Sequence, residues 1–167
     1  TTRKRADLVW VFCGEGAGRG DLESACEGLP NVRMMPLQPL ERLNELLNLA
    51  DIHLLPQRAD AADLVMPSKL GGMLASGRPV VATSREGTEL ERVVAGCGLV
   101  VAPDNPDAFC AAVLAMAADP ELRSKLGQAG RTYAETNLAR EAILDDFEAE
   151  LMRLVSNGRS VVESSTT

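Results

Sequence analysis

Short apolar runs alternate with amphipathic stretches over the first hundred residues of the chain. The apolar runs predict strands at 7–13, 31–37, 51–56, 79–83 and 97–101, and the stretches between them predict helices at 21–28, 40–50, 68–76 and 87–96. Strict alternation of strands and helices with short connections is typical of an open parallel sheet with helices on both faces. The pattern therefore predicts an α/β fold with a doubly wound parallel sheet.

The pattern changes from Pro106 onward, where helix follows helix. A proline suits a helix start, and apolar residues at helical spacing predict a helix over 106–119. The segment 120–137 predicts one or two short helices, because Gly127 or Gly130 would break a longer one.

A last predicted helix covers 139–155 and has one apolar face, formed by Ile143, Leu144, Phe147, Leu151 and Leu154. Because large exposed apolar patches seek partners, we expect the chain to self-associate through this face if nothing else covers it. The residues 156–167 are polar and aperiodic, and we expect a flexible tail there. The sequence thus predicts one domain over 1–155, followed by the tail.

Composition narrows the function classes. The 167 residues are 46% hydrophobic and only 3% aromatic, so the core must consist mainly of Leu, Val, Ala and Met. A net charge of −7 argues against a nucleic-acid surface, although a helix N-terminus and one lysine suffice for a small anionic ligand. No apolar run approaches the roughly 20 residues of a membrane helix, and the first residues lack the layout of a signal peptide. We expect a cytoplasmic protein.

The cysteines of the chain are Cys13, Cys26, Cys97 and Cys110. They form no Cys-x-x-Cys pair and no metal-binding spacing, and two of them lie within apolar patterns. We expect four free thiols in a reducing compartment.

A glycine-rich loop at 14–20, "GEGAGRG", directly follows the first predicted strand. A dinucleotide-binding fingerprint needs glycines at relative positions one, three and six, and every register fails, because the third position is Arg19, Asp21 or Glu23. Two interpretations remain: a flexible connection, or a backbone surface that approaches a ligand closely.

The stretch from Pro67 to Gly72 combines a helix start with a basic residue. Ser68 is a good N-cap, and the N–H groups of the first helical turn with Lys69 beside them suit a diphosphate. Gly71 and Gly72 weaken the helix, and their small size would let a ligand approach. The alternative is an ordinary capped helix whose glycines serve close packing and whose lysine is solvated.

The order of these motifs resembles a known family. The series "FCGEG…LPNVRMMPLQPLERLNELLNLADIHLLP…PSKLGGMLASGRPVVATSREGTELERVVAGCGLVV" is similar to the C-terminal half of a GT-B glycosyltransferase of the large retaining family 4. It most resembles the branch of colanic-acid and other exopolysaccharide sugar transferases, and the similarity runs from Val9 to Leu154. The resemblance implies a Rossmann-like domain that binds the nucleotide-sugar donor, with no metal and no cofactor beyond that donor.

The resemblance also implies the site residues. They lie in four short segments, namely Gly14, Glu15 and Gly16; Met35, Pro36 and Leu37; Ser68, Lys69 and Leu70; and Gly87, Thr88 and Glu89. The first segment would be a loop against the ligand, the second the base pocket, the third the diphosphate site, and the fourth a glycine–glutamate element at another helix start. The acceptor would be a glycan or a lipid-linked sugar, which implies a location in the cytoplasm or at the inner face of the membrane.

Several parts of the family pattern are absent. Leu64 and Gly72 occupy the positions of two family glutamates, the second of which holds the ribose. The family's basic diphosphate clamp and acceptor-binding domain would lie upstream of the first residue, so we expect the chain to be one domain of a longer protein and inactive alone. His53, the only histidine, is expected to be a packing or surface residue. A sugar-nucleotide 2-epimerase-like domain and a non-catalytic nucleotide-binding or scaffold domain remain alternatives.

Overall fold

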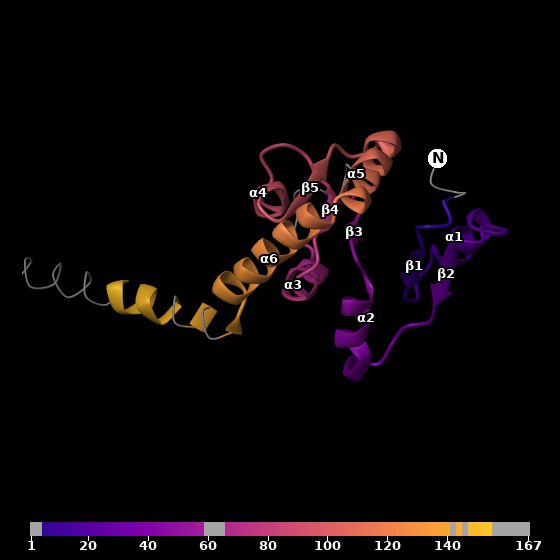
Figure 1. Ribbon diagram of the computed structural model, residues 1–167. Coiled ribbons are helices and arrows are strands. Elements are labelled where there is room, and N and C mark those ends of the chain that lie inside the picture. The colour runs from indigo at the N-terminus through magenta and orange to yellow at the C-terminus, as the bar shows by residue number, and fades with distance from the viewer. Residues whose placement is uncertain (1–4, 59–65, 141–142, 145–146, 155–167) are drawn as a thin grey trace, which may run out of the picture.

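Strands and helices alternate along the first part of the chain, as predicted (Figure 1). The computed structural model describes residues 5–58, 66–140, 143–144 and 147–154. The elements are β1 Trp10–Cys13, α1 Arg19–Ala25, β2 Val32–Met35, the 3-10 helix η2 Leu40–Arg42, α2 Leu43–Leu49, β3 His53–Leu55, α3 Ser68–Ala75, β4 Val80–Thr83, α4 Glu89–Ala95, β5 Gly98–Val101, α5 Pro106–Ala118 and α6 Pro120–Asn137.

All strand pairs are parallel, but the described strands form two sheets and not one. The strands β3, β4 and β5 make a three-stranded sheet in which His53, Val80 and Gly98 lie side by side. A separate pair, β1 and β2, aligns Trp10 with Val32. The sequence pattern did not predict this division, because an apolar run marks a strand without specifying which edges form hydrogen bonds. The side chain of Trp10 packs against the apolar core next to the larger sheet.

Helices cover both faces of the three-stranded sheet, which confirms the doubly wound arrangement. Val80 and Ala82 of β4 face one apolar cluster, together with residues of α3 and α4. Val81, between them, faces the second cluster with Val113 and Met116 of α5. Successive side chains of a strand point to opposite faces, so the buried run at 80–83 is the mark of a central strand.

The predicted helix break in 120–137 is wrong, since α6 runs unbroken from Pro120 to Asn137. Both glycines serve close packing. A Cβ on Gly127 would lie 3.0 Å from the carbonyl carbon of Gly77, and one on Gly130 would lie 3.1 Å from Leu74 Cδ2. Helix α6 therefore crosses the end of α3 closely, and this packing outweighs the local cost of two helical glycines.

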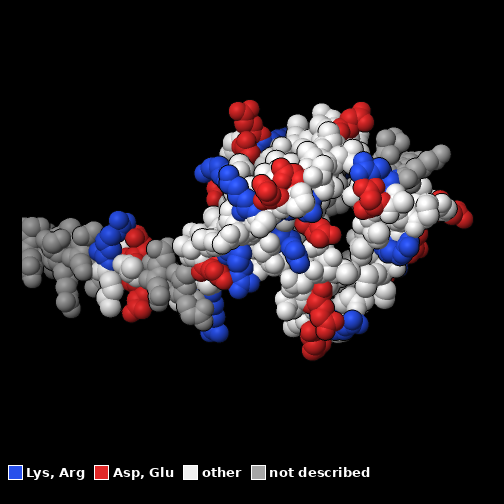
Figure 2. All heavy atoms as spheres, viewed as in Figure 1, with Lys and Arg blue, Asp and Glu red and all other residues white. Residues whose placement is uncertain are grey.

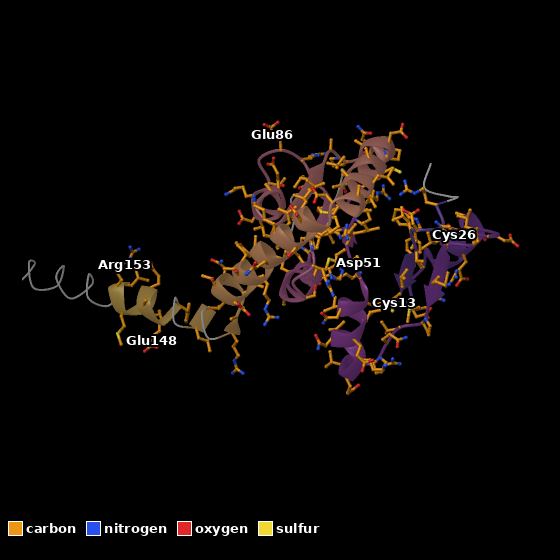
Figure 3. All side chains as sticks on the ribbon, in the orientation of Figure 1. Cys13, Cys26, Asp51, Glu86, Glu148 and Arg153 are labelled. Carbon is orange, nitrogen blue, oxygen red and sulfur yellow. The ribbon has the colours of Figure 1, made fainter. Side chains whose placement is uncertain are left out.

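The helix predicted at 139–155 is helical where the structure describes it, at Arg140, 143–144 and 147–154. These residues extend away from the sheet in Figure 1, and Figure 3 shows Glu148 and Arg153 pointing outward from the last segment. Phe147 is 63% exposed and the rest of the predicted apolar face is also exposed. The predicted tail at 156–167 lies outside the described residues. In the described part of the chain, no helix combines the length and apolar character needed to cross a bilayer.

The four cysteines and His53 agree with the predictions made for them. All four cysteines are free, with Cys13 and Cys26 on the β1–α1 unit in Figure 3. Burial raises the pKa of the Cys97 thiol to about 11. His53 is 7% exposed in β3, which confirms the packing role, and its Nε2 lies 3.0 Å from Ser76 Oγ. Burial and the nearby Arg78 charge lower the pKa of His53 to about 4.

Candidate functional site

The four predicted site segments follow strands or begin helices at strand ends. The loop at 14–16 follows β1, the residues 35–37 end β2, and 87–89 connects β4 to α4. The residues 68–70 form the first turn of α3. In open parallel sheets, ligands bind beyond the carboxyl ends of the strands. The first two segments belong to the β1–β2 sheet and the other two lie beside the three-stranded sheet, so a shared site requires a ligand that spans both.

The first two segments are joined by direct hydrogen bonds. The N–H of Gly14 donates to the carbonyl of Met35 at 3.3 Å. Arg19 Nη1 donates to the carbonyl of Gly14 at 2.6 Å and to that of Met35 at 3.1 Å. The same nitrogen lies 3.0 Å from Glu15 Oε1, and Arg19 Nε donates to Glu23 Oε1 at 2.8 Å. The structure thus places Gly14, Glu15 and Met35 around one arginine.

Sequence reasoning missed Arg19. The sequence did contain a sign of its ion pairs. Glu15, Arg19 and Glu23 are spaced four residues apart, and such spacing pairs opposite charges along a helix. What the spacing does not show is the second function of this guanidinium, which is to bond two backbone carbonyls from different strand ends.

The end of β2 leaves the backbone N–H and C=O of one residue, Leu37, without partners among the described residues. Pro36 has no N–H, and its carbonyl accepts from Gln38 Nε2 at 2.9 Å and lies 3.2 Å from Cys13 Sγ. Leu37 is 70% exposed. A donor and an acceptor on one residue can pair with the polar edge of a nucleobase.

A small hollow lies next to Leu37. Its volume is about 200 Å³, and its walls come from the end of β2 and from the following helical segment, at Met35, Gln38, Arg42, Glu45, Leu46 and Leu49. The hollow is smaller than a typical ligand pocket of roughly 300–1,000 Å³, so these residues alone form only part of a binding site.

The start of α3 differs from the prediction in one respect: Ser68 is not the N-cap. Pro67 takes that position, and its carbonyl accepts from the N–H of Leu70 at 2.9 Å. Ser68 is already helical, and no side chain caps the helix. The N–H groups of Ser68 and Lys69 consequently have no partner among the described residues, and Lys69 is exposed without an ion pair to any of them.

The other residues of this helix start are structural. Leu70 is 1% exposed, belongs to the apolar core and has its N–H bonded to Pro67, so it supports the helix start from below. A Cβ on Gly72 would lie 3.3 Å from Leu47 Cδ1, and one on Gly71 would lie 3.8 Å from Leu138 Cδ1. The contact at Gly72 supports the interpretation that this glycine serves close packing between α2 and α3.

The segment between β4 and α4 is largely occupied by its own capping. Gly87 has a φ of +82°, a conformation that favours glycine. Thr88 Oγ1 accepts from the N–H of Glu91 at 3.2 Å and lies 2.6 Å from Ser84 Oγ. Glu91 Oε2 in turn accepts from the N–H of Gly87 at 2.6 Å. This reciprocal arrangement is close to a capping box; of the three predicted residues, Thr88 is buried, and Gly87 and Glu89 are exposed.

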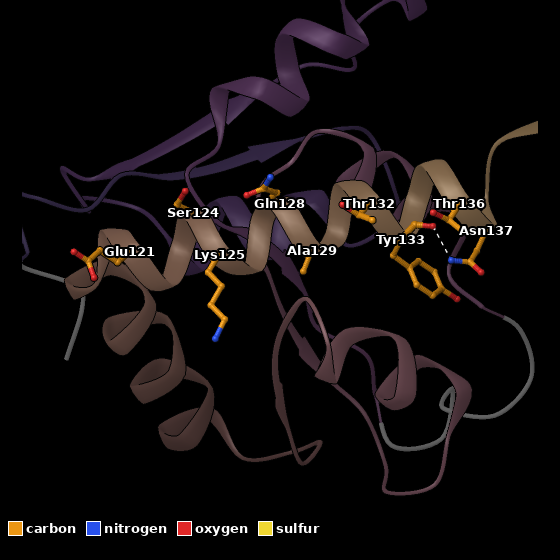
Figure 4. Close-up of a pocket in the computed structure, with 9 residues that line it drawn as sticks. All are labelled: Glu121, Ser124, Lys125, Gln128, Ala129, Thr132, Tyr133, Thr136 and Asn137. Carbon is orange, nitrogen blue, oxygen red and sulfur yellow. Dashed lines mark hydrogen bonds between the residues drawn. The ribbon is translucent and has the colours of Figure 1, made fainter.

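A second and larger hollow lies elsewhere. It has a volume of about 840 Å³ and runs along the outer face of α6, where mainly exposed side chains line it (Figure 4). It shares no residue with the predicted site, and it is a wide open surface without a buried polar group. The face of the molecule in Figure 2 shows acidic and basic side chains interspersed. We therefore locate the candidate site at the strand ends and the start of α3.

No metal centre is indicated in the part of the chain that the structure describes. No three His, Cys, Asp or Glu side chains lie together there as a metal-binding group.

Known structures with this arrangement are GT-B glycosyltransferases. WaaG, a glycosyltransferase involved in lipopolysaccharide biosynthesis, superposes with a TM-score of 0.63 and 23% identity over 77% of this chain and 34% of its own. Anabaena Alr3699/HepE, solved in complex with UDP-glucose, superposes with a TM-score of 0.68 and 13% identity over 90% of this chain and 45% of its own. At these identities the likeness establishes the fold, which is the C-terminal part of GT-B.

The sequence comparisons define the family. The family model "Glycosyl transferases group 1" matches residues 1–119, and the chain belongs to this family. It is 34% identical over 145 residues to the putative colanic acid biosynthesis glycosyl transferase WcaI of Escherichia coli (strain K12). That match covers 84% of this chain and 35% of WcaI, so the chain spans about a third of the length of this curated relative.

Proposed function

We propose that this chain is the nucleotide-sugar-binding domain of a glycosyltransferase that builds a polysaccharide or glycoconjugate. The observation that carries the proposal is the start of α3, where the exposed Lys69 lies beside two N–H groups that have no partner among the described residues, an arrangement suited to an anion. The family, the resemblance to WcaI and the UDP-glucose bound to HepE support the same donor class.

Each site segment has a role in this proposal. The backbone N–H and C=O of Leu37 pair with the base, and Met35 and Pro36 lie beside it. Ser68 and Lys69 hold the diphosphate, and Leu70 anchors this helix start in the apolar core. The loop of Gly14, Glu15 and Gly16 forms one wall of the site, and Gly87, Thr88 and Glu89 form another.

The proposed reaction transfers a sugar from the nucleotide to a glycan or lipid-linked acceptor, with retention at the reacting carbon and without a metal. A second, acceptor-binding domain of the same polypeptide closes on the donor, and the closed site stabilises the leaving diphosphate. The four free thiols suit a cytoplasmic protein, and a lipid-linked acceptor would bring it to the inner face of the membrane.

A non-catalytic nucleotide-binding domain is the second candidate. Its support is the contact between Gly72 and Leu47, which fills with packing the position where the family pattern has a ribose-binding glutamate. Transfer activity in the full-length protein separates the two candidates.

The test of the diphosphate site is Lys69→Ala in the full-length protein. Loss of a charged hydrogen bond should weaken nucleoside-diphosphate binding by about 1–3 kcal/mol in calorimetry. Lys125→Ala is the matched control, since Lys125 is an exposed lysine on α6 that belongs to the other hollow. Equal affinity of the Lys69→Ala variant and the wild type would refute the assignment.

The 167-residue chain alone should bind nucleoside diphosphates weakly and transfer no sugar, because the proposed acceptor domain supplies the rest of the site. A radiolabel assay with candidate nucleotide-sugars measures this directly. Turnover above the no-protein control would show that the catalytic groups lie within these residues.

A further inference from the structure

Arg19 connects two parts of the candidate site that come from different strands. Its side chain is only 25% exposed, and its Nη1 donates to the carbonyls of Gly14 and Met35. Two carboxylates flank the guanidinium, with Glu15 at 3.0 Å and Glu23 at 2.8 Å. Hydrogen bonds from a charged donor are stronger than neutral ones, so this is the strongest polar connection between the β1 loop and the end of β2.

Packing contributes little to holding the loop after β1. A Cβ added at Gly14, Gly16 or Gly18 would meet no atom within 4 Å, so no neighbouring element packs closely on the loop at these positions. Gly14 has a φ of +140°, a backbone conformation that residues with a side chain rarely adopt. Apart from the Arg19 contacts, one hydrogen bond of 3.3 Å, from the N–H of Gly14 to Met35, ties this loop to β2.

We propose that Arg19 is a positioning residue for the nucleotide. By donating to the carbonyls of both Gly14 and Met35, it fixes the loop after β1 relative to the backbone N–H and C=O of Leu37. Both segments can then contact one ligand. This inference rests on the proposed function. The Nε and Nη1 of Arg19 donate to protein acceptors, and it is these contacts that position the two backbone segments.

The charge of Arg19 acts in the same direction. Without it, the carboxylates of Glu15 and Glu23 would lose their counter-charge beside an anionic ligand. Loosening of the loop and repulsion of the ligand would therefore both weaken nucleotide binding.

The experiment compares Arg19→Gln and Arg19→Lys with Arg131→Gln in the full-length protein. Arg131 is a matched control, because it also pairs with a glutamate four residues on and donates to a distant carbonyl, that of Ala75, away from the candidate site. Two quantities are measured at a temperature where every variant is folded: amide hydrogen exchange at 13–20 and 33–38 without nucleotide, and the Kd for a panel of nucleoside diphosphates.

Arg19→Gln should speed exchange in both segments and raise the Kd roughly tenfold, the scale of one charged hydrogen bond. Arg19→Lys should retain most of the affinity, since an ammonium still donates to the two carbonyls, and Arg131→Gln should change neither quantity. Wild-type exchange in Arg19→Gln, or faster exchange with an unchanged Kd, would overturn the positioning role. Faster exchange in Arg19→Gln together with no nucleotide binding by the wild type would refute the proposed function and leave only the structural connection.

Discussion

Replacing Gly127 by alanine tests the close crossing of α6 over the end of α3. The new Cβ would lie 3.0 Å from the carbonyl carbon of Gly77 and 3.4 Å from the Cα of Arg78, and closer still to the carbonyl oxygen of Gly77. Carbon atoms prefer separations of about 3.5–4.0 Å and the carbonyl oxygen is the nearer obstacle, so α6 would have to move by roughly 1 Å or more. The obstacles are backbone atoms, which cannot rotate away as a side chain does.

The expected cost follows from two opposing effects. Overpacking of a well-packed contact costs about 1–3 kcal/mol, and alanine regains about 1 kcal/mol as the better helix former. Because the obstacles are rigid backbone atoms, the overpacking cost lies at the upper end of its range, and Gly127→Ala should lower the free energy of unfolding by about 2 kcal/mol or more. Gly20→Ala is the matched control, because a Cβ at Gly20 in α1 meets nothing within 4 Å, and it should stabilise the protein by about 0.4–1 kcal/mol.

Urea unfolding followed by circular dichroism measures both variants, with an unchanged denaturant slope as the sign that the native state is comparable. A Gly127→Ala variant as stable as the wild type, or more stable, would refute the close crossing. It would also restore the interpretation that the glycine merely weakens the helix.

Three further predictions concern the core, pH and association. Leu74→Ala should lower the free energy of unfolding by about 2–5 kcal/mol in the same urea assay, because Leu74 is fully buried in the main cluster. The folded-state pKa of His53, about 4, lies below its ordinary 6.5, so the folded protein binds fewer protons and stability should fall as pH drops from about 6.5 to about 4. His53→Gln should lose that part of the pH dependence, and a variant with the wild-type pH profile would contradict the assignment. The exposed face of Phe147, Leu151 and Leu154 should make the 167-residue chain self-associate, and light scattering should show a monomer after substitution of these residues by serine. A wild-type chain that stays monomeric at high concentration would contradict this.

The sequence predicted the elements well because their apolar patterns are local. The run at 80–83 is buried at every position, as a central strand requires, and the alternation of strands and helices suffices to predict helices on both faces. The break predicted in α6 was wrong for a non-local reason. The local cost of Gly127 is visible in the sequence, whereas its contact with Gly77, fifty residues earlier, is not.

The site was less predictable than the fold. The N-cap of α3 depended on which carbonyl accepts the first helical bond, and Pro67 provides it in place of Ser68. The role of Arg19 depended on two carbonyls brought together by the pairing of β1 and β2. Motif order placed the site segments at strand ends, but hydrogen-bond partners follow from tertiary structure, which a local pattern does not contain.

Mapping nucleotide binding onto the backbone tests the central claim most directly. The measurement is the change in amide chemical shifts of the full-length protein on titration with uridine, guanosine and adenosine diphosphates. We predict saturable shifts at Leu37, Ser68 and Lys69 for at least one of them, and none at Gln128 on the open face of α6. Shifts confined to α6, or no shift with any nucleoside diphosphate, would contradict a donor site at the strand ends.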